Sequence, residues 1–153
     1  MSKDKPKKKD KAAKRSDGPT PADAEIVLKL YELRREPVMR ASRETLLRWF
    51  PESYEELAAL ADFGSEQNAA FRQVTSYFEM AFGLARRGAV HPELLMDWCG
   101  EGVFLYAKLE PFLAEFRERV SPTAFANTQW VIENTEAGRS KLELHRSRLA
   151  KRD

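Results

Sequence analysis

The chain has 153 residues, enough for one domain with a tail, and its 42% apolar, 33% charged and 10% aromatic residues are typical of a globular protein. Its single cysteine, Cys99, excludes an intramolecular disulfide and any zinc site built from cysteines alone. The longest stretch without a charged residue, 120–132, is short and contains many polar side chains, so the sequence predicts no transmembrane segment.

Alanine and leucine dominate the apolar residues, with 19 Ala and 16 Leu against 7 Val and 2 Ile. Alanine and leucine favour helices, whereas β-branched residues favour strands. We therefore expect an all-α fold, an irregular bundle of five or six helices with a disordered Lys-rich N-terminal tail.

Charge is distributed unevenly along the chain. Residues 1–20 carry a net charge of +5, residues 139–153 carry +4, and residues 21–138 between them carry −7. We expect three parts: a disordered basic tail over 1–19, a helical bundle domain over 20–138 and a basic C-terminal helical extension over 139–153. An acidic body with two basic ends is typical of a protein that acts through contacts with partners.

Capping residues and prolines predict the helices of the N-terminal half. The first helix begins at Thr20, where a hydroxyl N-cap precedes a proline, and it ends before Pro37. A second helix spans about 38–50. A short third helix begins at the Ser53 capping box and ends at Gly64.

The strongest periodic segment, about 65–87, predicts the central helix of the bundle. Its apolar residues recur at three- and four-residue spacing and form one stripe: Phe71, Val74, Phe78, Ala81, Phe82 and Ala85. After it, Pro92 begins a short helical turn. A helix over 103–120 bends near Pro111, and a last helix spans about 123–150.

His91, His145 and Cys99 are the residues from which a metal site or a nucleophile would be built. Their spacing matches no zinc motif, so we expect His91 to cap a helix start and Cys99 to be a small buried residue. The Gly-Glu-Gly run at 100–102 lacks the other parts of a phosphate-binding loop and indicates a helix break. We therefore expect no catalytic, cofactor-binding or metal-binding residue, no cofactor and no small-molecule ligand.

Two groups of residues remain as candidate contacts. The tail offers a possible anion or partner contact through basic residues that would bind phosphates without reading sequence: Lys7, Lys8, Lys9, Lys11, Lys14 and Arg15. On the central helix, Arg72 lies one turn after Asn68. We expect a buried polar site in which Arg72 is partly buried and paired with a carboxylate of another helix, Glu101 being one candidate.

The end of the last helix is basic and poor in apolar residues. We expect residues 139–153 to project from the bundle and to dock on an acidic partner surface, a second copy of the chain or a phosphate backbone. The alternative is that this segment lies along the acidic body of its own chain.

Three stretches carry a resemblance to a known family: LYELRREPVMRASR (Leu30–Arg43), NAAFRQVTSYFEMAFGLARRGAVHPELL (Asn68–Leu95) and GEGVFLYAKLEPFL (Gly100–Leu113). Together they resemble an uncharacterised bacterial family of small all-helical proteins, of the domain-of-unknown-function type. The resemblance implies a helical fold and no known reaction.

The function that we expect is that of a non-enzymatic helical interaction or scaffold protein, cytoplasmic, with a protein partner or self-association. One alternative is a nucleic-acid- or ribosome-associated protein that binds phosphates through the basic tail. The other is an enzyme of unrecognised type.

Overall fold

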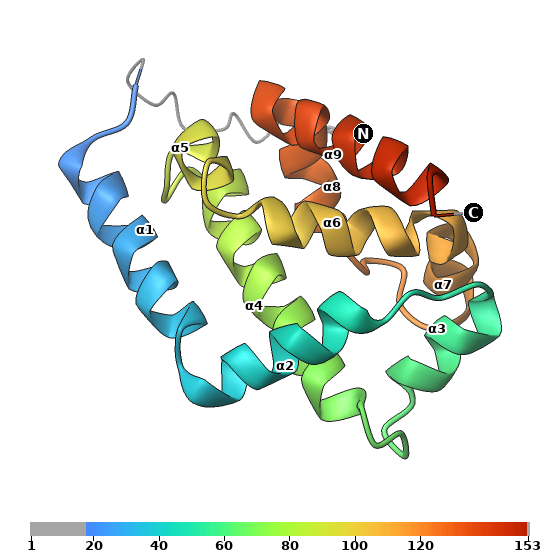
Figure 1. Ribbon diagram of the computed structural model, residues 1–153. Helices are drawn as coiled ribbons and strands as arrows, with labels where there is room; N and C mark the ends of the chain where they lie inside the picture. The colour runs from blue at the N-terminus through green and yellow to red at the C-terminus, as the bar shows by residue number, and fades with distance from the viewer. Residues whose placement is uncertain (1–17, 153) are drawn as a thin grey trace, which may run out of the picture.

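The computed structural model describes residues 18–152, and within that range all regular structure is helical, which confirms the all-α expectation (Figure 1). The Lys-rich tail expected to be disordered lies outside the described residues. In chain order the elements are α1 (Pro21–Arg34), α2 (Pro37–Arg48), α3 (Tyr54–Ala61), α4 (Asn68–Arg86), α5 (Pro92–Met96), α6 (Gly100–Leu109), the 3₁₀ turn η1 (Glu110–Phe112), α7 (Leu113–Arg119), α8 (Ala126–Asn134) and α9 (Glu136–Ala150).

Residues 18–152 form nine α-helices, so the expected number of five or six is wrong. The expected helix over about 123–150 is in fact two helices that meet at Thr135. The Thr135 hydroxyl donates to the Val131 carbonyl at 2.6 Å and accepts from the Gly138 amide at 2.9 Å, so one side chain ends α8 and caps α9.

The start of α1 is fixed by the expected capping box. Asp23 Oδ2 accepts from the Thr20 amide at 2.7 Å, while Oδ1 accepts from the His91 amide at 2.8 Å. His91 Nδ1 in turn accepts from the Leu94 amide at 3.4 Å, which confirms that His91 caps a helix. The buried Asp23 carboxylate therefore joins the N-terminal ends of α1 and α5.

Helix α4 is the centre of the core. It runs through the middle of the molecule, and its most extensive packing is against α2 and α8 (Figure 1). The whole predicted apolar stripe of α4 is buried, and Phe78 is only 2% exposed to solvent. The periodicity thus predicted both the helix and its buried face.

Helix α6 begins at Gly100 and not at the expected 103, because the two glycines open the helix and do not interrupt it. A Cβ atom at Gly102 would lie 2.7 Å from Phe78 Cδ1 and 2.8 Å from the ring of Phe82. Only a residue without a side chain lets the first turn of α6 lie this close to the rings of α4.

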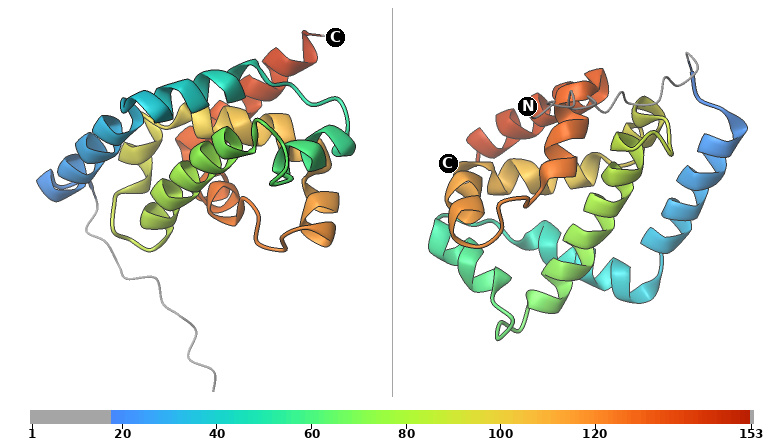
Figure 2. Two further views of the ribbon diagram at one scale, coloured as in Figure 1. Left: turned by 90° about the horizontal axis from the view of Figure 1, so that it is seen from below. Right: turned by 180° about the vertical axis from the view of Figure 1, so that it is seen from behind.

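Helix α9 lies along its own chain, so the expectation that residues 139–153 project is wrong and the alternative holds. Figure 1 and Figure 2 show α9 alongside α6, and it also packs against α8 and α5. Leu142 is buried in this contact, and Arg146 Nε donates to Glu110 Oε2 at 2.9 Å. Ala137 and Leu149 are partly buried against the core as well, so these apolar contacts and the ion pair together hold a segment whose other residues are mostly polar.

Candidate functional site

Asn68 and Arg72, two of the predicted site residues, contact each other. Arg72 Nε donates to Asn68 Oδ1 at 2.8 Å, and Asn68 Nδ2 donates to the Leu60 carbonyl at 3.1 Å. Asn68 is buried as expected, but Arg72 is exposed and its guanidinium lies over the Phe63 ring. The two residues fix the start of α4 to the end of α3 and do not form a buried polar site.

Glu101, the third predicted residue, pairs with Arg43 of α2, so the expected pairing with Arg72 is wrong. Arg43 Nε lies 2.9 Å and 3.1 Å from the two Glu101 oxygens, and Nη2 lies 2.5 Å from Oε2. The Arg43 and Glu101 side chains are only 21% and 18% exposed. The hydrogen bonds to Glu101 raise the pKa of Arg43, and the two charges neutralise each other in a link between α2 and α6.

The tail residues expected to contact anions, Lys7, Lys8, Lys9, Lys11, Lys14 and Arg15, lie outside the described residues. Cys99 is buried as expected, and burial raises the pKa of its thiol to about 11. A buried thiol with a raised pKa is a poor nucleophile at neutral pH, because the thiolate is the reactive form.

Lys108 is the most unusual ionisable residue among those described. It is only 5% exposed, and its ammonium group donates to the carbonyls of Leu46 at 2.5 Å and Trp49 at 2.8 Å. These carbonyls end α2, where the helix dipole favours a cation. The rings of Phe50 and Phe104 lie 4.8 Å and 4.9 Å from Nζ, at cation–π distance.

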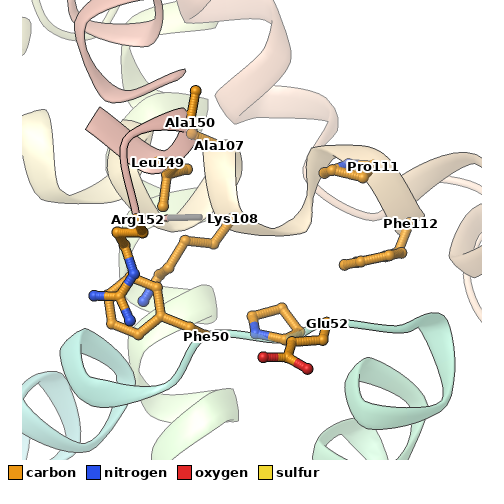
Figure 3. Close-up of a pocket in the computed structure, with 10 residues that line it drawn as sticks. Phe50, Glu52, Ala107, Lys108, Pro111, Phe112, Leu149, Ala150 and Arg152 are labelled. Carbon is orange, nitrogen blue, oxygen red and sulfur yellow. The ribbon is translucent and has the colours of Figure 1, made fainter. Parts of the chain in front are cut away.

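A hollow of about 340 Å³ opens beside Lys108 (Figure 3). Helix α6 and the segment after it contribute one wall, the segment after α2 a second, and the end of α9 a third. The lining residues are Phe50, Pro51, Glu52, Ala107, Lys108, Pro111, Phe112, Leu149, Ala150 and Arg152. We refer to this hollow as the Lys108 pocket.

Arg152 covers one side of the Lys108 pocket. Its guanidinium carbon lies 3.5 Å from the centroid of the Phe50 ring, so the cation stacks on the aromatic face. Figure 3 shows the side chains of Lys108 and Arg152 both reaching the Phe50 ring, with Phe112 on the other side of the hollow. Burial, together with a smaller effect of the Arg152 charge, lowers the pKa of Lys108 to about 8.

A second hollow of about 300 Å³ shares Phe50, Leu149 and Arg152 with the Lys108 pocket. Phe104, His145 and Arg148 complete its lining. Burial lowers the pKa of His145, whose Nδ1 is buried without a hydrogen-bond partner. The end of α9 thus presents cations and an imidazole above an aromatic floor.

A wider hollow of about 490 Å³ lies between α4 and the segment before α8. Its one carboxylate, Glu79, accepts from the Thr128 amide at 2.8 Å and from the Asn127 amide at 3.1 Å, and so caps α8. Its arginine, Arg72, is engaged with Asn68. Because both charged groups already have structural partners, the Lys108 pocket is the stronger candidate site.

Sequence reasoning did not select Lys108 and Arg152. A signal for Lys108 was present, because the helix from Val103 to Leu109 is apolar on all its sides and leaves a cation no solvated face to occupy. No comparable signal exists for Arg152, whose position over Phe50 depends on how α9 packs.

Within residues 18–152, no group of three or more His, Cys, Asp or Glu side chains is arranged to hold a metal ion. The helices described are also too short or too polar to cross a membrane. The cytoplasmic location stays a prediction.

The comparisons with known proteins agree with the expected resemblance. Residues 19–135 match the family described as Domain of unknown function (DUF4760). No curated protein and no solved structure matches the chain. The matched residues include α1 to α8, whereas α9, with Arg152 just beyond it, follows them.

Proposed function

The chain belongs to the family described as Domain of unknown function (DUF4760), and we propose that it is a non-enzymatic interaction protein that binds an acidic protein partner through the exposed face of α9. One observation carries the proposal. Arg148 and Lys151 are exposed on this face, and neither forms an ion pair with any carboxylate of residues 18–152. Elsewhere in that range, Arg40 of α2 and Arg87 at the end of α4 are exposed and unpaired as well, so what distinguishes this face of α9 is that these two unpaired cations lie within two turns of the exposed Leu144.

The exposed face of α9 is mixed in character, which favours a protein over a nucleic acid. Leu144 is 47% exposed, and Glu143 beside it is exposed as well. A phosphate backbone gains nothing from an exposed leucine, whereas a protein interface combines an apolar centre with charged residues at its rim. The nucleic-acid-associated alternative depends on the basic tail, outside the described residues.

The proposal is tested by identifying the partner and then measuring its affinity. Affinity purification from the native cells, at two salt concentrations and with or without nuclease, selects the candidate, and calorimetry with the purified candidate gives the dissociation constant. Replacing both cations in the variant Arg148→Glu/Lys151→Glu should weaken binding by about tenfold or more, since like charges then face an acidic surface.

The matched control is Arg40→Glu/Arg87→Glu, which makes the same change of charge at exposed, unpaired arginines of α2 and the end of α4. This variant should bind as the unmodified protein does. If both double variants weaken binding equally, the effect depends only on the net charge of the protein, and the proposal is contradicted. Loss of the candidate after nuclease treatment would contradict it in favour of nucleic acid.

A further inference from the structure

We propose that the Lys108 pocket binds a small carboxylate with an apolar body, such as an arylcarboxylate, between the Lys108 ammonium and the Arg152 guanidinium. This inference goes beyond the proposed interaction function, because it concerns a small molecule and depends on residues other than Arg148 and Lys151. Its basis is that two cations, Lys108 and Arg152, line one half-open hollow and both contact the Phe50 ring.

Two cations that approach each other without a carboxylate between them repel, and an anion placed between them removes that repulsion. Neither Lys108 nor Arg152 forms an ion pair within residues 18–152, and the Arg152 charge acts against protonation of Lys108. The only acidic residue in the lining is Glu52. The lining therefore carries a net charge of +1 while Lys108 is protonated, which suits a monoanion better than a phosphate dianion.

Both cations have hydrogen-bond donors left for a ligand. The Lys108 ammonium has three N–H bonds and donates two of them to the carbonyls of Leu46 and Trp49. Arg152 contacts Phe50 through the face of its guanidinium, so the N–H bonds in the guanidinium plane stay free of that contact. Stacking thus orients the planar donor group that matches the two oxygens of a carboxylate.

The other residues of the lining indicate which chemical group the ligand carries besides its carboxylate. Apolar side chains and prolines make up most of it: Phe50, Pro51, Ala107, Pro111, Phe112, Leu149 and Ala150. A volume of about 340 Å³ is at the small end of the range for ligand pockets, about 300–1,000 Å³. A single aromatic ring with one carboxylate fits both the volume and the lining.

The charged groups near Lys108 make the affinity for the proposed ligand depend on pH. They are Arg152 at the end of α9, Glu101 on α6 itself and Glu52 after α2. A bound carboxylate favours the protonated amine, so affinity should be full below pH 8 and fall as the pH rises through about 8, where the free amine loses its proton.

The test is an NMR titration of the full chain with benzoate, and with benzamide, acetate and inorganic phosphate as comparison probes. Benzoate should shift the signals of residues lining the Lys108 pocket and bind about tenfold tighter than each comparison probe. The variant Arg152→Leu should weaken benzoate binding by about tenfold, while Arg40→Leu, at an exposed arginine of α2, should leave it within about twofold.

Lys108→Met supplies a second readout, because it should remove the decline in benzoate affinity between about pH 7 and pH 9.5. If this variant does not fold, the pH profile of the unmodified chain still tests the same point. Equal binding of benzoate and benzamide would overturn the proposal, as would phosphate binding as tightly as benzoate. A flat pH profile in the unmodified chain would exclude the role of Lys108.

Discussion

The burial of Phe78 in α4 gives a quantitative test of the core. The ring is 2% exposed, so Phe78→Ala removes nearly the whole favourable transfer of a phenyl ring from water, about 2–3 kcal/mol. The neighbouring groups limit collapse of the space that is left. Phe82 is fully buried and stacked at 5.9 Å between ring centroids, and Gly102 has no side chain to move inward.

The cavity therefore adds to the transfer loss, and we expect Phe78→Ala to lower the free energy of unfolding by about 3–5 kcal/mol. Urea titration followed by circular dichroism measures it, and the m-value should stay constant if the folded state keeps its compactness. Phe63→Ala is the control, because that ring is 80% exposed and its loss should cost less than about 1 kcal/mol. A loss below about 1 kcal/mol for Phe78→Ala would refute the placement of α4 at the centre of the core.

Three further changes test individual contacts. Burial lowers the pKa of Lys108 to about 8 from 10.5, so the unfolded chain binds more protons between these values. The free energy of unfolding of the unmodified chain, relative to that of Lys108→Met, should therefore rise with pH across that window by at most about 3 kcal/mol. Urea titrations of both proteins at several pH values measure this difference. A difference that does not change with pH would contradict the burial of Lys108. Arg43→Lys keeps the charge but loses the two-pronged contact with Glu101, so it should lower the free energy of unfolding by about 1–2 kcal/mol in the same assay. Gly138→Ala should destabilise, although alanine favours helices by about 1 kcal/mol, because the new Cβ would lie 2.5 Å from Thr135 Oγ1. An unchanged or raised melting temperature for Gly138→Ala would show that α8 and α9 are not packed this closely.

Local signals explain why much of the fold was predictable. Thr20 and Ser53 cap the helices that the sequence assigned to them, and the apolar stripe of α4 is buried throughout. Each of these features depends on residues within a few positions of one another. The break at Thr135 was missed because a threonine inside a helical pattern has the same local appearance whether it caps a new helix or continues the old one.

Contacts between helices were less predictable. Glu101 was expected to pair with an arginine, and it does, but with Arg43 and not Arg72. All three residues lie on helices whose relative rotation determines which guanidinium comes within reach. The periodicity of one helix gives the direction of its buried face and not its register against a neighbour.

The buried charge of Lys108 links the stability of the fold to the proposed site. Replacing a buried ionic group with a hydrophobic one of similar size is often neutral or stabilising, so burial of this ammonium is weak evidence that it stabilises the fold. Its contacts with the end of α2 and with two aromatic rings offset part of the desolvation cost. The lowered pKa shows that the rest of that cost remains. The Arg152 charge also lowers the pKa of Lys108, and Arg152 forms no ion pair with a carboxylate of residues 18–152. The stacking of Arg152 on Phe50 stabilises the packing of the chain end, but its charge beside the Lys108 ammonium is unfavourable, and the carboxylate of the proposed ligand would remove that repulsion.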